Sequence, residues 1–418
     1  MSVEINKNKI CIIIGASHGG VNCAFALRKE GWEGGILLFD SDPTLPYHRP
    51  PLSKTYLTGN DGVDRNMLKS PESYEKAAIT LNLGVKINAI NRTKKTILSD
   101  KGINHSYDKL VIAAGARPLI PSIPGIDLDS NIFTMRTALD ANNIRIAYNK
   151  LNRKRIVVIG GGYIGLETAA SLKKLGADVT ILEREERLLA RITAPVMSDF
   201  FQELHIQNKV KVFTSKNVVS ITADQVANLV TCEDGSVYPA DMIIVGVGIQ
   251  VNQELAADAG LEVKNGIKVN SATQTSDENI YAIGDCTFHH NIHYDCYVRL
   301  ESVQNAVDQA KIAAAAICGK NPIYNSIPWF WSDQYDVKLQ MVGLSKGYNE
   351  LLIRREIEKE NCFSAWYFKD EKLLAVDAIN NGKAYVLGTK FIKGGHLLNK
   401  TNLIDSNVEF KPVNLLEV

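Results

Sequence analysis

Two glycine-rich turns are the segments of this sequence whose spacing points most directly to chemistry. They are Gly15-Ala16-Ser17-His18-Gly19-Gly20 and Gly160-Gly161-Gly162-Tyr163-Ile164-Gly165. Each turn follows a short apolar run and precedes a helical pattern, and a second apolar run then ends in an acid, Asp40 or Glu183. A strand, a glycine turn, a helix and a strand with a terminal acid form the βαβ unit that binds a dinucleotide. The repeat therefore predicts two dinucleotide sites in one chain.

The three glycine positions of such a turn have separate physical tasks. The first allows the tight turn, the middle one lets the backbone approach a pyrophosphate, and the last lets helix and strand pack closely. The helix N-terminus then presents unpaired N–H groups and a positive dipole end to the phosphates. Gly160, Gly162 and Gly165 fit the pattern, whereas Ser17 replaces the middle glycine of the first copy. The small Ser17 side chain is either tolerated there or hydrogen-bonds phosphate, so it weakens the motif only modestly.

The elements that must position these turns are also visible in the pattern. Apolar runs at 110–114, 242–245 and 280–283 each lead into a glycine, as strands of a parallel sheet do. An alanine-rich helix is expected over 302–318, and from about residue 328 the apolar and polar residues alternate as in antiparallel strands. We therefore predict an α/β fold with two Rossmann-like dinucleotide-binding domains and a C-terminal α+β domain.

Composition excludes several classes of function. The 418 residues carry 47 Lys plus Arg against 46 Asp plus Glu, which argues against a nucleic-acid binder or a polybasic membrane binder. No apolar run approaches the roughly 18 residues of a membrane span, and the first residues do not resemble a signal peptide, so we expect a cytoplasmic protein. The seven cysteines show no C-x-x-C or C-x₄-C spacing, which excludes a local redox dithiol and indicates buried thiols in a reducing compartment.

One histidine cluster has spacing that suggests a metal site. His289, His290 and His293 lie close together, but no acid stands in helical register with them. We interpret this segment as a solvent-exposed loop and expect no metal.

Two dinucleotide sites suggest a bound flavin and an exchanging nicotinamide, with hydride passing between them. A duplicated site that binds only one ligand remains an alternative. Glu183 favours NADH, because a carboxylate accepts the ribose 2′-OH and repels a 2′-phosphate. Arg184, Arg187 and Arg191 leave NADPH as the less favoured choice, since an arginine just past the strand can bind that phosphate.

Five further segments resemble one family closely. They are LPYHRPPLSK at 45–54, GLE at 165–167, GD at 284–285, RLESVQNA at 299–306 and PWFWSDQ at 328–334. Together they resemble the FAD-dependent ferredoxin reductases of bacterial cytochrome P450 and Rieske oxygenase systems, from about residue 8 to beyond 390. The chain departs from that family at Ser41, where an acid is frequent, and at Val251, where proline is common.

The resemblance implies an architecture similar to that of glutathione reductase. It predicts an FAD domain at 1–115 and 247–325, an NAD(H) domain at 116–246 and a C-terminal domain at 326–418. It assigns the first glycine turn to FAD and the second to the nicotinamide cofactor, which spacing alone does not decide. It also implies that hydride passes from NADH to FAD N5 and that electrons leave singly to a [2Fe–2S] ferredoxin, which feeds a P450 or Rieske oxygenase. The protein is expected to be a monomer or a weak homodimer.

The same resemblance implies roles for individual residues. Lys54 would stand beside flavin N5 and Glu167 would pair with it near the nicotinamide; otherwise they are an exposed lysine and a favourable acid in a first helical turn. The residues expected to bind FAD are Gly15, Ser17, His18, Gly19, Gly20, Asp40, Ser41, Asp42, Arg49, Lys54, Val85, Ala114, Gly115, Arg136, Gly284, Asp285, Glu301, Ser302, Val303 and Trp331. The residues expected to bind NAD are Gly160, Gly162, Tyr163, Ile164, Gly165, Glu183, Arg184, Arg191 and Gly248.

Some of these roles have plain structural alternatives. Arg136 would contact the FAD pyrophosphate or adenosine side, or else form a surface salt bridge. Trp329 or Trp331 would pack on the flavin, or else belong to the core, as large aromatic residues usually do. At the level of activity, the same scaffold also suits a rubredoxin reductase, a monodehydroascorbate reductase, a peroxide-forming NADH oxidase or an NADH-sensing flavoprotein.

Overall fold

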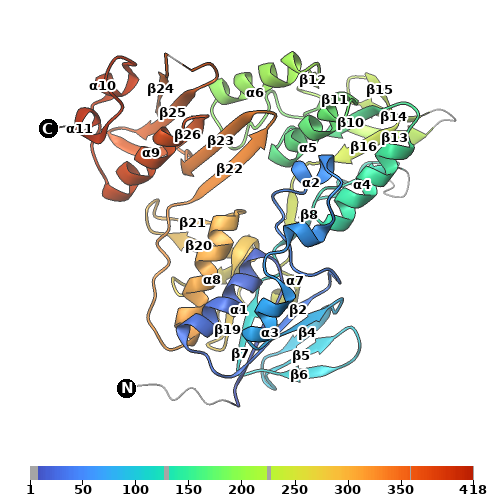
Figure 1. Ribbon diagram of the computed structural model, residues 1–418, viewed down its shortest axis with the longest axis vertical. Helices are drawn as coiled ribbons and strands as arrows, with labels where there is room; N and C mark the ends of the chain where they lie inside the picture. Colours follow the sequence, from blue (N-terminus) through green and yellow to red (C-terminus); the bar gives the residue numbers. More distant parts are fainter. Residues whose placement is uncertain (1–7, 127–130, 224–226, 358, 418) are drawn as a thin grey trace. The chain divides into compact units, whose positions relative to one another are not determined.

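The computed structural model describes residues 8–126, 131–223, 227–357 and 359–417. The chain divides into two compact units, each assembled from three separate stretches of sequence (Figure 1). The first unit comprises Met1–His48, Gly62–Arg117 and Gln250–Pro328. The second unit comprises Arg49–Asp61, Pro118–Ile249 and Trp329–Val418.

The first unit is built on a parallel sheet with strand order β19-β7-β1-β2-β3. These strands are β1 (Ile10–Ile14), β2 (Gly35–Asp40), β3 (Ile79–Leu83), β7 (Lys109–Ile112) and β19 (Ile280–Ala282). Helices α1 (His18–Glu30) and α8 (Val303–Ile317) pack side by side, although they are far apart in sequence (Figure 1). Alternation along β1 explains the two layers, because Cys11 and Ile13 pack with α1 and α8 while Ile12 and Ile14 belong to the core of the opposite face.

Smaller elements complete the first unit. A sheet of β4 (Ile87–Asn91), β5 (Thr96–Ser99) and β6 (Asn104–Ser106) adds residues to the core that contains Ile12 and Ile14. Another sheet contains β18 (Ile267–Val269), β20 (Thr287–Asn291) and β21 (Cys296–Val298). The short helices are α3 (Pro71–Lys76), α7 (Glu254–Asp258) and the 3₁₀ turns η1 (Val63–Asn66) and η2 (Gly284–Cys286).

The prediction of a solvent-exposed histidine loop was wrong for His289, whereas His290 is exposed and His293 lies in a turn. His289 and His290 lie in strand β20, and His289 is only 2% exposed. The His289 ring packs against Tyr324 at 5.1 Å, and its Nδ1 lies 3.3 Å from Gln309 Nε2. A buried polar partner on a neighbouring helix thus gives this histidine a place in the core, which the sequence spacing does not reveal.

The second unit contains a sheet with strand order β12-β11-β10-β16-β9. These strands are β9 (Ile132–Phe133), β10 (Arg155–Ile159), β11 (Asp178–Leu182), β12 (Lys211–Phe213) and β16 (Met242–Val245). The helices are α2 (Thr55–Thr58), α4 (Ala138–Lys150), α5 (Tyr163–Lys174) and α6 (Pro195–Gln207), and a sheet of β13 (Val218–Ala223), β14 (Asn228–Cys232) and β15 (Val237–Ala240) adjoins them. The short strands β8 (Ala116–Pro118) and β17 (Ile249–Val251) pair where the chain passes from one unit to the other.

The C-terminal part of the second unit is antiparallel, as the alternating pattern predicted. Its sheet has the order β22-β23-β26-β25-β24 (Figure 1). The elements are β22 (Trp329–Gln334), β23 (Val337–Gly343), β24 (Glu350–Arg355), β25 (Phe363–Lys369), β26 (Lys372–Ile379), α9 (Gly382–Gly394), α10 (Lys400–Ile404) and α11 (Pro412–Leu415).

The expected α/β class with two Rossmann-like regions and a C-terminal α+β region is confirmed. The division into three domains stays a prediction, because the two compact units group the residues after 329 with those of 118–249. Among the described residues, no helix is both long and apolar enough to cross a membrane.

Candidate functional site

The two glycine turns have nearly identical geometry, each within its own unit. Gly15 and Gly160 both have a left-handed backbone, with φ of 105° and 109°. A Cβ at Gly15 would lie 2.2 Å from the carbonyl oxygen of Ala113, and a Cβ at Gly160 would lie 2.4 Å from that of Gly246. Only glycine fits these positions, because both the positive φ and the adjacent carbonyl exclude a side chain.

The last glycine of each turn lets the helix approach the strand. A Cβ at Gly20 would lie 1.8 Å from the carbonyl oxygen of Gly15, and one at Gly165 would lie 2.2 Å from that of Gly160. By contrast, a Cβ at Gly162 would meet no atom of the described residues within 4 Å. The middle position therefore faces open space, as a loop that admits a phosphate must.

The terminal acids close each turn through the same hydrogen bond. The carboxylate of Asp40 accepts from the N–H of Ala16 at 2.6 Å, and that of Glu183 accepts from the N–H of Gly161 at 2.5 Å. Neither α1 nor α5 carries an acid in its first turn, so nothing in that turn opposes the positive end of the helix dipole. The two motifs are thus duplicated in geometry as well as in sequence.

The other acid near the first turn has a bracing role. Asp42 Oδ2 accepts from the hydroxyl of Tyr47 at 2.8 Å, and its Oδ1 accepts from the N–H of Thr44 at 2.9 Å. Ser41 is exposed, and the buried ring of His18 lies 5.4 Å from that of His48.

Five of the remaining residues expected at the FAD site lie at strand ends of the first unit, namely Val85, Ala114, Gly115, Gly284 and Asp285. Val85 donates its N–H to the Asp40 carbonyl, while the carbonyls of Ala114 and Gly115 accept from Asn252. The turn at Gly284 and Asp285 is held by Gln309, whose Oε1 accepts from the Gly284 N–H at 2.8 Å.

The start of α8 is ordered by its own cap. Ser302 is the N-cap, and its hydroxyl accepts from the N–H of Asn305 at 3.1 Å, so Val303 begins the helix. Glu301, just before the cap, forms an ion pair with Arg299 at 2.6 Å.

Four residues expected at the FAD site belong to the second unit, namely Arg49, Lys54, Arg136 and Trp331. The Arg49 side chain donates to the carbonyl of Arg136 at 2.8 Å, next to the capped N-terminus of α4. Trp331 is partly buried and lies 5.4 Å from Trp329, ring to ring.

Glu167 is a buried acid of the second unit with three side-chain partners. It is 2% exposed, and its Oε2 lies 2.8 Å from Lys54 Nζ and accepts from the Ser53 hydroxyl at 2.6 Å. Its Oε1 accepts from the Ser332 hydroxyl at 2.7 Å. Ser171 on α5 fixes the loop by donating to the Ser53 carbonyl. The alternative reading of Lys54 as an exposed lysine is wrong, since its side chain is only 17% exposed and is paired with a buried carboxylate.

Ser53 and Ser332 were missed as partners of Glu167. Both stand inside the segments that carry the family resemblance, but no pattern in the sequence connects them with an acid more than a hundred residues away. The available signal was the buried phase of β22, in which Ser332 and Gln334 alternate with more exposed residues.

The arginines near Glu183 divide into different environments. Arg187 is committed to the fold, because it donates to the carbonyls of Thr193 and Ala190 and to Ser198. Arg184 forms an exposed ion pair with Glu185 at 2.8 Å.

The end of β16 and the start of α5 hold the other residues expected to bind NAD. A Cβ at Gly248 would lie 3.8 Å from the Arg191 guanidinium, so these two residues adjoin each other. At the start of α5, the Tyr163 hydroxyl donates to Met341 Sδ at 2.8 Å, and Ile164 is 45% exposed.

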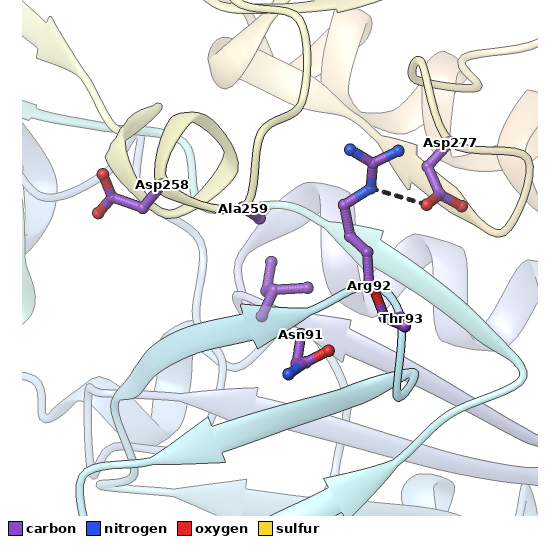
Figure 2. Close-up of a pocket in the computed structure, with 7 residues that line it drawn as sticks. Asn91, Arg92, Thr93, Asp258, Ala259 and Asp277 are labelled. Atoms are coloured by element: carbon purple, nitrogen blue, oxygen red, sulfur yellow. Dashed lines mark hydrogen bonds and ion pairs between the residues drawn. The ribbon is translucent and has the colours of Figure 1, made fainter.

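A separate open pocket lies on the first unit (Figure 2). Its volume is about 500 Å³, and an ion pair of Arg92 with Asp277 at 2.8 Å stands at its edge. The lining residues are Ile90, Asn91, Arg92, Thr93, Asp258, Ala259 and Asp277, none of which is expected to bind a cofactor.

Comparison with known proteins assigns the chain to a family. Residues 9–310 match the family described as Pyridine nucleotide-disulphide oxidoreductase, and residues 329–414 match a Reductase C-terminal domain. The chain belongs to this oxidoreductase family. It is 41% identical over 417 residues to putidaredoxin reductase CamA of Pseudomonas putida, covering 98% of this chain and 97% of that protein.

Further relatives of this oxidoreductase agree with that assignment. A rubredoxin–NAD(+) reductase of Pseudomonas putida is 36% identical over 370 residues, covering 88% of this chain and 95% of that protein. The crystal structure of a covalent putidaredoxin reductase–putidaredoxin complex matches with a TM-score of 0.93 and 40% identity, covering 98% of both chains. The resemblance to ferredoxin reductases seen in the sequence is therefore confirmed.

The residues fit the cofactors of this oxidoreductase family, which are FAD and a pyridine nucleotide. Each unit presents one glycine turn that a single Cβ would obstruct, at Gly15 and at Gly160, followed by a helix without an acid in its first turn. Such a turn suits the pyrophosphate of a dinucleotide.

Proposed function

We propose that this protein is an NADH-dependent reductase that passes electrons through FAD to a [2Fe–2S] ferredoxin, which in turn supplies a cytochrome P450 or Rieske-type oxygenase. The observation that carries the proposal is similarity to putidaredoxin reductase along nearly the whole chain, including the C-terminal region. The duplicated glycine turns support it, because a reductase of this kind needs two dinucleotides.

The proposal assigns the first glycine turn to FAD and the second to NADH. In sequence, the FAD domain would comprise 1–115 and 247–325, the NAD(H) domain 116–246 and the C-terminal domain 326–418. The FAD residues would be those of the first glycine turn, of the strand ends of the first unit and of the start of α8, together with Arg49, Lys54, Arg136 and Trp331. The NAD residues would be those around the second turn and Gly248.

Bound FAD supplies an acceptor of electron pairs that releases electrons one at a time. The protein contributes charge and order to this chemistry. Lys54 provides a cation that stabilises negative charge on the reduced ring. Glu167 holds the Lys54 ammonium at 2.8 Å, and the hydroxyls of Ser53 and Ser332 hold the carboxylate in turn. These bonds fix the lysine, so that the charge is in place before the reaction begins.

The preference for NADH is supported by the arrangement of charges after β11. Glu183 places a carboxylate at the strand end, where it repels a 2′-phosphate. Arg187 is occupied by α6 and the loop before it, and Arg184 is paired with Glu185. These contacts leave Arg191 as the arginine that favours NADPH.

Single electrons would leave directly from the flavin to the partner protein. A disulfide reductase instead passes electrons through a cysteine pair, and here all seven cysteines are described and all are free. Electrostatic attraction between basic residues of the reductase and an acidic ferredoxin would assist a weak docking. We place the protein in the cytoplasm, since free thiols suit a reducing compartment. Five of the seven are buried as expected, whereas Cys296 is exposed and Cys318 is partly exposed.

The test is reduction of cytochrome c by NADH, measured with and without an added [2Fe–2S] ferredoxin. The proposal expects strong dependence on ferredoxin and bleaching of the yellow flavin by NADH in the absence of air. Rapid peroxide formation without ferredoxin would identify an NADH oxidase instead. A slow, long-lived charge-transfer complex with NADH would identify an NADH-sensing flavoprotein.

A rubredoxin reductase is the second candidate, because a relative with that name is 36% identical over most of this chain. Parallel assays with purified rubredoxin and ferredoxins separate the two. A higher kcat/KM for rubredoxin would replace the ferredoxin proposal.

A further inference from the structure

A chain of buried polar side chains continues beyond Ser332, within the second unit. Gln334 Nε2 lies 3.4 Å from Ser332 Oγ, and Gln334 Oε1 lies 3.0 Å from His205 Nε2. His205 Nδ1 lies 3.3 Å from the hydroxyl of Tyr335. The exposed fractions of Ser332, Gln334 and His205 are 1%, 1% and 0%, so the contacts among these three side chains are shielded from water.

The carboxylate of Glu167 sets the direction of every hydrogen bond in this chain. A carboxylate only accepts, so the Ser332 hydroxyl must donate to it and is left to accept from the Gln334 amide nitrogen. The Gln334 oxygen then faces His205, which must carry its proton on Nε2. His205 Nδ1 is left to accept from the hydroxyl of Tyr335. The donors therefore all point toward Glu167.

Such an arrangement requires a neutral imidazole. Burial lowers the pKa of His205 from 6.5 to about 4, so its ring is neutral at physiological pH. Each donor in a uniformly directed chain polarises the next, which strengthens the last bond, here the one received by a buried carboxylate. Ser332 and Gln334 share one face of β22, and His205 lies on α6, so α6 is connected to Glu167 through this strand.

We propose that His205 is a positioning residue for the Lys54–Glu167 pair, acting through Gln334 and Ser332. It orients the Gln334 amide, which orients the Ser332 hydroxyl, which fixes the carboxylate that holds the lysine. This inference rests on the proposed role of Lys54 at the flavin. It extends that role to a residue that touches neither the lysine nor the acid.

The test compares holoenzyme variants by the flavin midpoint potential and by the rate of anaerobic flavin reduction with NADH. His205→Phe removes both ring hydrogen bonds while filling the space, and Ser332→Ala removes the donor to Glu167. We expect both to slow flavin reduction by about 3- to 10-fold and to shift the potential in the direction given by Glu167→Gln. Ser332→Thr restores the hydroxyl and should return both quantities toward the wild-type values.

The matched control is Phe201→Leu. Phe201 is fully buried on the same helix one turn before His205, and no hydrogen bond joins it to the chain among the described contacts. It should lower the melting temperature but leave the flavin potential and reduction rate at wild-type values. The double variant His205→Phe/Ser332→Ala should show little more effect than Ser332→Ala alone, because both act on the same bond.

Two outcomes would overturn the inference. One is a His205→Phe variant that matches Phe201→Leu in potential and rate, and the other is additive effects of His205→Phe and Ser332→Ala. Failure of the proposed function would look different. In that case Glu167→Gln would leave the flavin unchanged, or NADH would fail to reduce the wild-type flavin at all.

Discussion

Lys54 Nζ lies 2.8 Å from Glu167 Oε2, so a lysine from a proline-stiffened loop is paired with a buried acid on the helix that follows the second glycine turn. The loop at 49–61 is accordingly part of the second unit, although the residues on both sides of it belong to the first. A buried charge that loses its partner is costly, so this pair constrains the loop as well as the chemistry.

Replacing Lys54 should therefore affect both reaction and stability. We expect Lys54→Met to slow anaerobic flavin reduction by about 10- to 100-fold, equivalent to about 1.4 to 2.8 kcal/mol of barrier, and to lower the melting temperature. Lys54→Arg keeps the charge and should lose less. Lys101→Met, at an exposed lysine, is the control. Stopped-flow absorbance of the flavin measures the rate, and a wild-type rate for Lys54→Met would remove its proposed role.

Substitutions of two glycines in the second turn should separate the effect on helix packing from the effect on NADH binding. Gly165→Ala places a methyl group 2.2 Å from a backbone carbonyl and should destabilise the second unit by several kcal/mol. Gly162→Ala meets open space and should fold normally with FAD bound, while raising KM for NADH about tenfold by obstructing the pyrophosphate. Thermal unfolding and steady-state kinetics distinguish the two variants. A reversed order of effects would contradict the geometry.

Glu183 should determine the choice of nicotinamide. We expect Glu183→Gln to lower the ratio of kcat/KM for NADH over NADPH by about tenfold or more, because the repulsion of a 2′-phosphate is lost. The amide keeps an oxygen able to accept from the N–H of Gly161, so the turn should survive. Glu185→Gln, at the neighbouring surface acid, should change the ratio little. Equal ratios for the two variants would refute the assignment.

His205 should make stability depend on pH on the acid side. Its folded pKa of about 4 lies below the unfolded value near 6.5, so the unfolded chain binds a proton that the native state refuses. Stability is therefore lost as pH falls from about 6.5 to 4, by up to about 3 kcal/mol. Urea titrations at several pH values give the free energy of unfolding. In this pH window, the slope of that free energy against pH should be smaller in His205→Phe than in the wild type, by the amount that corresponds to about one proton. His289, whose pKa burial also lowers to about 4, keeps its contribution in that variant.

Asp377 should change stability in the opposite direction over nearly the same pH range. Burial raises its pKa to about 7, and the Tyr367 hydroxyl donates to Oδ2 at 2.5 Å. The native state therefore keeps a proton that the unfolded chain loses above pH 4, and stability falls as pH rises from about 4 to 7. Asp377→Asn removes this dependence, so the variant should be more stable than wild type at pH 8 and similar at pH 4. Urea unfolding at pH 4 and pH 8 measures the free energy of unfolding of both proteins. Equal stability of the variant and the wild type at pH 8 would contradict the assignment.

The sequence predicted the glycine turns well because their determinants are local. Gly15 and Gly160 adopt a positive φ that the local turn requires, and Asp40 and Glu183 close the turns at fixed offsets. Those constraints are visible without knowledge of tertiary structure.

The environment of Glu167 was less accessible to prediction. Lys54 is indicated by family resemblance, and no motif in the sequence marks His205. The hydroxyls that bond Glu167 come from Ser53 and from Ser332 on β22, and His205 is connected to Glu167 through β22. Each of these hydrogen bonds joins residues more than a hundred positions apart, and such bonds leave no periodic trace in the sequence. The histidines of β20 were misjudged for the same reason, since the burial of His289 depends on Gln309 and Tyr324.

The interleaving of the two units has a consequence for how the protein is made. Ribosomes release the chain from its N-terminus at roughly 5–20 residues per second. β1, β2 and β7 emerge early, but β19, which pairs with the other side of β7, follows only after most of the second unit's Rossmann region has been synthesised. The nascent first unit therefore waits with an open sheet edge, and its folding is completed late in translation.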